Sequence, residues 1–281
     1  MFHVWHQARM TDLLQGFRGT AYNPVPQSEN RIHGDEIARQ HGFRGGLVPG
    51  VVVSAYLLDP AVRAFGLQAL AGSYAEVVVH KPLYDGDAFD VKLEAQAANG
   101  YRAALFDAHG TRLCEGRFEL RPSPSVPPPS WRGLPRAPRA AEREPATREV
   151  LSRLQTQGLG SLRARFDAEH EMGRYHPTLE AQPALVRPEP SGYANFAFLL
   201  GLTDWALARN VRLGPWLHLQ TWSHHLAPVP YGTELVIEPR VHDLFERKGH
   251  QFVDIDVAAF DADQRPVLAA RMRAIYELRS A

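Results

Sequence analysis

The 281-residue chain contains the same order of segments twice. The first half has an apolar run at 50–58, followed by strand-like stretches at 75–97 and 101–121. The second half has an apolar run at 192–208, followed by similar stretches at 216–241 and 250–278. An internal repeat constrains the fold strongly, because each copy must form the same supersecondary unit. We therefore interpret the chain as a duplication.

Three anchors align the two copies. The anchors occur in the same order in both copies. The offset, the difference in residue number within a pair, grows from one pair to the next, as insertions in the second copy would produce. The pairs are Gly50 with Gly192 (offset 142), Pro82 and Gly86 with Pro228 and Gly232 (offset 146), and Phe106-Asp107-Ala108 with Phe260-Asp261-Ala262 (offset 154).

The local patterns favour strands after each apolar run. The stretches are short, rich in β-branched or aromatic residues, and partly alternating. They are separated by Asp85-Gly86-Asp87, Asn99-Gly100 and His109-Gly110, where we expect turns with positive φ. Residues 196–208 are long enough for a buried helix and contain good helix formers. Residues 51–53 (Val-Val-Val) favour a strand by propensity, although the flanking prolines are compatible with either structure.

A helix that is apolar all round is buried when several antiparallel strands wrap around it. The sequence therefore predicts an α+β fold built from two such units. Placed side by side, their sheets would join into one surface and remove a pair of exposed edges.

Residues 122–148 separate the copies. This stretch contains eight prolines, so we expect it to run extended with few backbone donors. The predicted organisation is a first domain at 1–121, a proline- and arginine-rich linker at 122–148, and a second domain at 149–281.

Composition limits the classes of function. The 31 basic and 31 acidic residues give a formal net charge of zero, so no general affinity for nucleic acid or anionic membrane is expected. Cys114 is alone, which argues against a disulfide framework or a cysteine-rich metal site. The first residues lack a signal-peptide core, and no apolar run reaches the ~18–20 residues of a membrane span, so we expect a cytoplasmic protein.

Of the 31 basic residues only three are lysines, which leaves 31 − 3 = 28 arginines. Coding bias in a GC-rich genome accounts for such an excess. Some of the arginines could instead bind phosphate or carboxylate, which their planar fork suits. Dinucleotide, phosphate-loop, nucleophile-elbow and metalloprotease motifs are missing from the sequence, so we expect no metal and no organic cofactor.

Residues 28–50, SENRIHGDEIARQHGFRGGLVPG, carry a resemblance. They are similar to the hydratase motif of the MaoC-like hot-dog superfamily, and the Arg-Ile-His-Gly-Asp run at 31–35 resembles the double hot-dog hydroxyacyl-thioester dehydratases. The matching positions are Asn30, Ile32, His33, Asp35, Ala38, Gly42, Phe43, Gly46 and Gly50. The resemblance implies a double hot-dog fold and hydration or dehydration of an acyl thioester.

The resemblance also implies roles for residues. His33 would be the acid/base, because a histidine can give or take a proton near neutral pH. Asn30 or Glu29 would be its partner. Gly46 and Gly50 would present backbone N–H groups to the thioester oxygen. Three further residues, Phe43, Val48 and Asp35, complete the predicted substrate-contacting set. The residues themselves favour Asp35 as the cap of a turn over 36–41.

The chain departs from the family pattern at three positions. The usual acidic residue five positions before the histidine is Ser28, the usual proline after the asparagine is Arg31, and the usual His-Gly pair is Pro49-Gly50. The second copy reads ALVRPEPSGYAN at 184–195 and has no counterpart of the Asn30–His33 motif. We therefore expect one site per chain.

Two other functions stay open. Since one fold hosts several activities, an acyl-CoA thioesterase could use Asp204 or Asn195, and Asp204 is unusual as a carboxylate within the apolar stretch GLTDWALA. The altered residue at Ser28 is compatible with a non-catalytic acyl-binding protein. In each case the expected partner is acyl-CoA or an acyl carrier protein, and a homodimer stays open.

Overall fold

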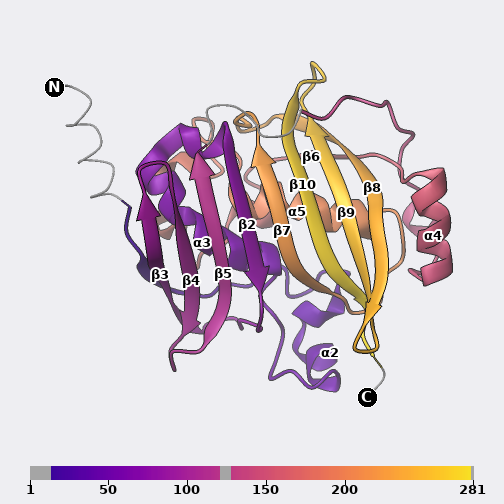
Figure 1. The fold of residues 1–281 in the computed structure, drawn as a ribbon, viewed down its shortest axis with the longest axis horizontal. Helices are drawn as coiled ribbons and strands as arrows, with labels where there is room; N and C mark the ends of the chain where they lie inside the picture. The colour runs from indigo at the N-terminus through magenta and orange to yellow at the C-terminus, as the bar shows by residue number, and fades with distance from the viewer. Residues whose placement is uncertain (1–13, 121–127, 280–281) are drawn as a thin grey trace.

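The structure, a computed structural model, describes residues 14–120 and 128–279. Within them, ten strands form one antiparallel sheet in the order β1-β3-β4-β5-β2-β7-β10-β9-β8-β6 (Figure 1). The strands are β1 (Phe17–Thr20), β2 (Ser73–Val79), β3 (Ala88–Ala97), β4 (Gly100–Asp107), β5 (Arg112–Leu120), β6 (Leu162–Arg165), β7 (Leu217–His225), β8 (Glu234–Arg247), β9 (His250–Phe260) and β10 (Pro266–Glu277).

The sheet has the same strand order on either side of its centre. Strands β1 to β5 form one half and β6 to β10 form the other, and the halves meet where β2 pairs with β7 between Ser73↔His225 and Val78↔Gln220. The expected joining of two units into one sheet is confirmed. The α+β class is confirmed with it.

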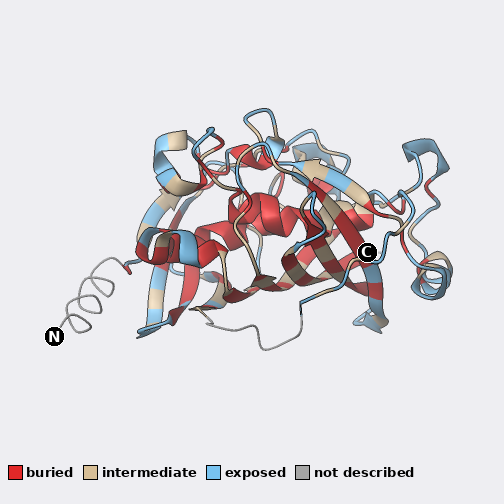
Figure 2. Cartoon of the chain, turned by 90° about the horizontal axis from the view of Figure 1, so that it is seen from above, coloured by how far each residue is buried: buried red, intermediate tan, exposed pale blue. Residues whose placement is uncertain are grey.

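One long helix from each half lies against the concave face of the sheet. These are α3 (Gly50–Phe65), which continues into the 3-10 turn η2 (Gly66–Leu70), and α5 (Phe196–Ala208). Almost every residue of α3 is buried, and both helices run through the buried centre in Figure 2. Tertiary burial overrides the strand propensity of residues 51–53, and Pro60 lies inside the helix.

The span Gly50–Leu70 is long and apolar enough to cross a membrane, contrary to our expectation from sequence. The residues are mostly buried inside the protein, as expected for the core helix of the sheet.

The remaining described elements are short. They comprise the helices α2 (Asp35–Gln40) and α4 (Arg148–Gln157), and the 3-10 turns η1 (Arg31–His33), η3 (Ala140–Glu142), η4 (Glu171–Gly173), η5 (Leu179–Ala181) and η6 (Ala184–Val186).

Matching hydrogen bonds establish the correspondence between the two halves. The amide of Val48 donates to the Leu83 carbonyl, and that of Ala194 donates to Val229, so both residues shift by 146. The first residues of α3 and α5 differ by the same 146. The counterpart of Gly50 is therefore Phe196, and the anchor that paired Gly50 with Gly192 was wrong.

The third anchor is confirmed by its geometry. The Asp107 carboxylate accepts the amides of His109 and Thr111, and the Asp261 carboxylate accepts those of Asp263 and Arg265. The same turn therefore recurs at an offset of 154, and most of the added residues lie in the longer strands β8 and β9.

The turn prediction holds at two of its three glycines. Gly86 and Gly110 have positive φ, whereas Gly100 does not. Gly100 begins β4, and a Cβ there would lie 2.1 Å from the Phe118 carbonyl oxygen. This glycine is required by a close approach between strands and not by a turn.

The chain between the halves is attached to the second half where the structure describes it, from residue 128. The amides of Arg132 and Leu134 donate to the buried Glu238 carboxylate on β8. Farther along, Arg143 is buried and donates to the carbonyl oxygen of Ala208 at the end of α5. Residues 122–127 of the predicted linker lie outside the described residues, and its domain boundaries stay a prediction.

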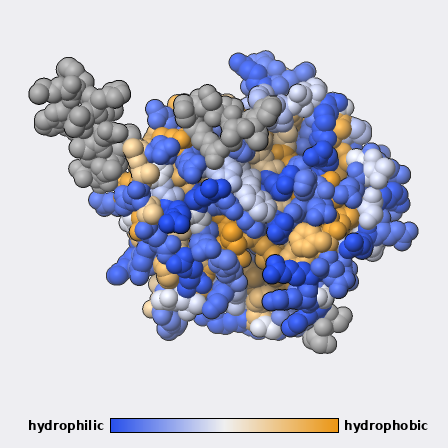
Figure 3. All heavy atoms as spheres, in the orientation of Figure 1, coloured by the Kyte–Doolittle hydropathy of each residue, from blue (hydrophilic) through white to orange (hydrophobic). Residues whose placement is uncertain are grey.

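The outer face of the sheet carries charged pairs. Arg273 bonds Asp254, and Arg271 bonds Asp256, across β10 and β9. Hydrophilic side chains cover much of this face in Figure 3, with hydrophobic ones between them. The cavities described below are lined by residues from the helices, the loops before them and the strand ends.

Candidate functional site

His33 is the last residue of the short turn η1, directly before α2. Its amide donates to the Asn30 carbonyl, and its own carbonyl accepts from the Asn23 side chain. Gly46 packs against the same carbonyl, since a Cβ at Gly46 would lie 2.3 Å from it. The backbone around the imidazole is therefore fixed from both sides.

The imidazole of His33 has a defined tautomer. Its Nδ1 lies 2.8 Å from the Leu47 carbonyl oxygen, which can only accept, so Nδ1 carries the proton and donates. Its Nε2 then has a lone pair, which accepts from Asn30 Nδ2 at 3.3 Å. Desolvation lowers the pKa of His33 below its usual value, opposed by the Leu47 hydrogen bond and the nearby charge of Asp204. The ring is therefore neutral at pH 7 and can accept a proton at Nε2.

Asn30 is the partner that contacts His33. Its Nδ2 also donates to the Trp216 carbonyl at 3.1 Å, and its Oδ1 accepts the Trp216 amide at 3.3 Å. These two bonds tie the first copy's loop to the start of β7 in the second copy.

Glu29, the other candidate partner, is paired with an arginine. Its carboxylate pairs with the guanidinium of Arg143 at 2.8 Å, and this hydrogen bond lowers the Glu29 pKa. The structure shows no contact between Glu29 and His33, although both line the second cavity, so a role for Glu29 as the partner stays a prediction.

Asp204 comes from α5 of the second copy and lies at the same end of the site. Its Oδ1 is 2.8 Å from Nδ1 of His218, whose Nε2 is 2.6 Å from the Thr221 hydroxyl. The side chain of His218 is only 3% exposed. His218 therefore orients the Asp204 carboxylate, and sequence reasoning missed it.

Gly50 begins α3 beside these groups. Pro49 is the N-cap and supplies no side-chain bond. Within the described part of the chain, the amides of Gly50 and Val51 have no hydrogen-bond partner, as is usual for the first amides of a helix. A Cβ on Gly50 would lie 3.0 Å from the His218 side chain, so glycine permits this packing.

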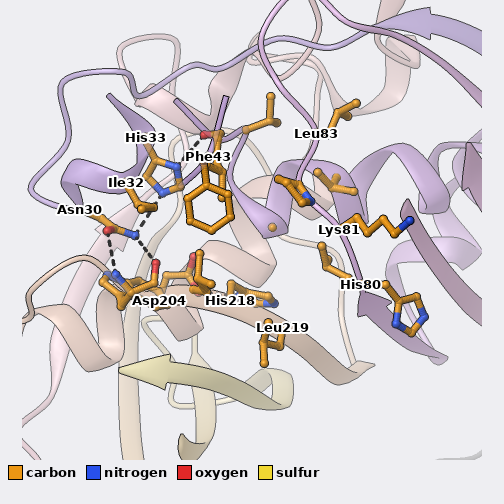
Figure 4. A pocket seen from close by; sticks show the side chains of 18 residues that line it. Asn30, Ile32, His33, Phe43, His80, Lys81, Leu83, Asp204, His218 and Leu219 are labelled. Atoms are coloured by element: carbon orange, nitrogen blue, oxygen red, sulfur yellow. Dashed lines mark hydrogen bonds and ion pairs between the residues drawn. The ribbon is translucent and has the colours of Figure 1, made fainter. Parts of the chain in front are cut away.

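Two cavities meet at this cluster. The first, of about 130 Å³, and the second, of about 430 Å³, share Asn30, His33, Asp204 and Trp216 as lining residues. Figure 4 shows His33, Asn30, Asp204 and His218 around one end of the first cavity, with Lys81 and His80 toward the other. Because the imidazole and the carboxylate line both cavities, a ligand bound in either one would lie beside these two groups.

The other predicted substrate contacts divide into two sets. Phe43, Val48 and Gly50 line the first cavity. Gly46 does not, and its amide donates to Asp35 Oδ1 at 2.9 Å, so it cannot serve the thioester oxygen. Asp35 makes no cap bond, because Gly34 is the N-cap of α2, and its carboxylate instead bonds Gly46 and Arg39. For Asp35 and Gly46 the predicted roles were wrong.

Asn195 is a structural cap. Its Oδ1 accepts the Phe198 amide at 2.8 Å, its Nδ2 donates to the Met172 carbonyl at 2.9 Å, and the residue is fully buried. It lines neither cavity, so Asn195 was wrong as a thioesterase candidate. Among the described residues, no group of three or more histidine, cysteine, aspartate or glutamate side chains is arranged to hold a metal.

Comparisons with known proteins identify the fold. No protein-family model matches the chain, and neither does any curated protein. A conserved hypothetical protein from Mycobacterium tuberculosis with a double hot-dog fold superposes with a TM-score of 0.59 at 16% identity, over 95% of this chain and 98% of that one. A MaoC domain protein assigned as a dehydratase, from Chloroflexus aurantiacus, gives 0.51 at 13%, over 99% and 92%. A protein assigned as a thioesterase, from Novosphingobium aromaticivorans, gives 0.50 at 13%, over 83% and 89%. The chain therefore has the double hot-dog fold, as its resemblance implied.

Proposed function

We propose that the protein adds water to an α,β-unsaturated acyl thioester, or removes water from the corresponding 3-hydroxyacyl thioester. The observation that carries the proposal is the neutral His33 imidazole, whose Nε2 lone pair lies where two cavities meet and where Asp204 also lies. The solved structures that share this fold include proteins assigned as dehydratases.

In the hydration direction, His33 Nε2 exchanges its long hydrogen bond from Asn30 for one from water, and takes a proton from that water as the water oxygen bonds to the β-carbon. Asp204 accepts a hydrogen bond from the same water, and its negative charge stabilises the imidazolium that forms. The imidazolium then gives its proton to the α-carbon. The overall addition is one water molecule, and dehydration follows the same steps in reverse.

Negative charge builds on the thioester oxygen between these steps. The free amides at the start of α3, at Gly50 and Val51, are the donors that would meet it, assisted by the helix dipole. His218 acts as a positioning residue, because it holds Asp204 and packs against Gly50 while both of its ring nitrogens are already hydrogen-bonded.

The direct experiment supplies crotonyl-CoA and a longer enoyl-CoA to the purified protein and follows both 3-hydroxyacyl product and free thiol. We expect hydration without thiol release, lowered about 10²–10⁴-fold in kcat by His33→Gln. Asp204→Asn keeps the shape of the carboxylate while removing its charge, and we expect it to lower kcat as well. Binding of the thioester with no turnover would instead indicate an acyl-binding protein.

A thioesterase is the second candidate, and the position of Asp204 favours it. This carboxylate lines both cavities and is 15% exposed at its side chain, so it could direct a water at the thioester carbon without His33. Saturated butyryl-CoA separates the two functions, because it cannot be hydrated. Thiol release from it that survives His33→Gln but not Asp204→Asn would select hydrolysis.

A further inference from the structure

The second cavity carries a group of arginines that the proposed chemistry does not use. Arg31, Arg143, Arg209 and Arg212 all line it. They come from three separate parts of the chain: the turn η1, the segment between the halves, and the residues after α5. The fold therefore gathers four positive charges on one side of the His33–Asp204 cluster.

Among the described residues, Arg143 is the one arginine of these four that forms an ion pair. Arg143 is buried and is neutralised by Glu29. Arg31, Arg209 and Arg212 are exposed, and no carboxylate within residues 14–120 and 128–279 forms an ion pair with them. Glu171 and Asp204 also line this cavity, and the charge of Arg209 interacts with those of Glu29 and Glu171. The lining therefore holds four arginines against three carboxylates, an excess of one positive charge. Arg31, Arg209 and Arg212 form the exposed rim of the cavity.

The first cavity differs in character. It has one lysine, Lys81, and the His80 there pairs with Glu115. Its walls are mainly apolar, formed by Ile32, Phe43, Leu47, Val48, Val53, Val79, Leu83, Leu217 and Leu219. An acyl chain is stabilised by apolar walls, whereas phosphate is recognised by the planar fork of arginine.

We infer that the thioester group binds beside His33 and Asp204, with its acyl chain in the first cavity and its phosphate-bearing arm in the second. The phosphate of a phosphopantetheine thioester is bound by the rim of Arg31, Arg209 and Arg212. This inference rests on the proposed function for the thioester itself, and it adds the orientation and the residues that recognise the carrier.

Binding measurements test the inference without turnover. The ligands are S-butyl-CoA and S-butyl-pantetheine, thioethers that can be neither hydrated nor hydrolysed, and calorimetry gives the affinity of each. We expect S-butyl-CoA to bind at least about tenfold more tightly, and Arg209→Ala combined with Arg212→Ala to bring that ratio close to one. Raising the salt concentration should weaken binding of the CoA compound and spare the pantetheine compound.

The matched control is Arg102→Ala, an exposed arginine on β4 that lies outside both cavities. It should keep the wild-type ratio. S-butyl-4′-phosphopantetheine identifies the source of the phosphate: affinity equal to that of the CoA compound indicates a single phosphate, as a carrier protein also presents. A further gain with CoA indicates recognition of its nucleotide.

Two results would overturn the inference. Equal affinity of wild-type protein for the CoA and pantetheine compounds would show that the rim binds no phosphate. Loss of the ratio in Lys81→Ala, with the arginine variant unaffected, would show that the phosphates lie at the opposite cavity. Failure of the proposed function would appear differently, as tight and phosphate-dependent binding with neither hydration nor thiol release.

Discussion

The two central helices begin in different surroundings, although the same backbone hydrogen bonds precede each of them. In η1 the amide of His33 donates to the Asn30 carbonyl, and in η6 that of Val186 donates to Pro183. The amide of Leu47 donates to Ile32, and that of Tyr193 to Leu185. His33 thus corresponds to Val186, and Asn30 to Pro183, so the second copy keeps the scaffold without the imidazole or the amide.

The helix starts differ in the same sense. Pro49 leaves the first amides of α3 free, whereas Asn195 caps α5 with its side chain. Gly50 opens the first helix start to a cavity, whereas its counterpart Phe196 is buried. At an offset of 146, Asp204 on α5 corresponds to the buried Leu58 on α3. At one end the helix amides are free and the compared positions carry titratable groups, whereas at the other end the helix is capped and the corresponding positions are apolar.

The first copy also has additional chain over its end. Ile32 to Leu47 spans 47 − 32 = 15 positions, while Leu185 to Tyr193 spans 193 − 185 = 8. The additional residues form α2 and supply Phe43 to the first cavity. The comparison teaches that one end of the duplicated fold is arranged for a ligand, while the other contributes stability and the Asp204 side chain.

The largest effect is expected for substitution of His33 compared with its counterpart Val186. His33→Ala removes the base, so we expect kcat/KM for the enoyl thioester to fall about 10²–10⁴-fold. Val186→Ala removes two buried methyl groups and should lower the free energy of unfolding by about 2 kcal/mol. Turnover and urea unfolding are measured for both variants. Equal loss of turnover in the two variants would contradict the division of roles between the ends.

Gly50→Ala tests the open helix start. The added Cβ would lie 3.0 Å from the His218 side chain, so we expect a loss of about 1–3 kcal/mol in the free energy of unfolding from overpacking. Because His218 holds Asp204, turnover should fall with it. Gly214→Ala provides the contrast, since a Cβ at Gly214 meets no atom within 4 Å, its φ is not positive, and Gly214 lies outside both cavities. Wild-type stability and turnover in Gly50→Ala would contradict the claim that the His218 side chain requires a glycine at this position.

Asn195→Ala tests the capped helix start. Loss of the cap should cost about 0.5–2 kcal/mol of stability, at the upper end because the Met172 carbonyl also loses a donor. Turnover, measured below the unfolding transition, should keep its wild-type value. A large fall in thiol release with unchanged stability would restore Asn195 as a catalytic group.

Much of the fold could be predicted because its signals are local or repeated. Strands β2 to β5 follow from alternating or β-branched stretches between turn residues. The pairing Gly50–Gly192 failed because a shared glycine is a weak anchor, whereas the loops after β2 and β7 preserve the offset of 146. Residues 51–53 form a helix because burial against the sheet outweighs β-branched propensity.

The site was less accessible to sequence reasoning. His33 and Asn30 lie in one short motif, so their proximity is local. His218 and Thr221 lie three apart on β7, and strict alternation would place them on opposite faces. The pairing with β10 shifts register between Arg273↔Gln220 and Ala274↔His218, and this bulge brings both onto the buried face. Nothing in the sequence around Leu219 marks that irregularity.

The pH dependence gives the smallest and most specific test of the difference between the ends. Because desolvation lowers the pKa of His33, its neutral form persists below pH 6.5. The acid limb of kcat/KM should therefore lie below that value. As pH falls through 6.5, the unfolded chain binds a proton at this position that the folded chain does not, so this residue lowers the free energy of unfolding.

Asp204 opposes the shift, since its charge raises the His33 pKa. Asp204→Asn should thus move the His33 titration to still lower pH, measured directly by NMR of labelled imidazoles with His33→Gln to identify the signal. Asp263→Asn, in the exposed turn between β9 and β10, is the control and should leave the titration in place. A His33 titration that moves upward, or stays fixed, in Asp204→Asn would place the carboxylate too far away to stabilise an imidazolium. The second copy's helix would then add only structure to the first copy's site.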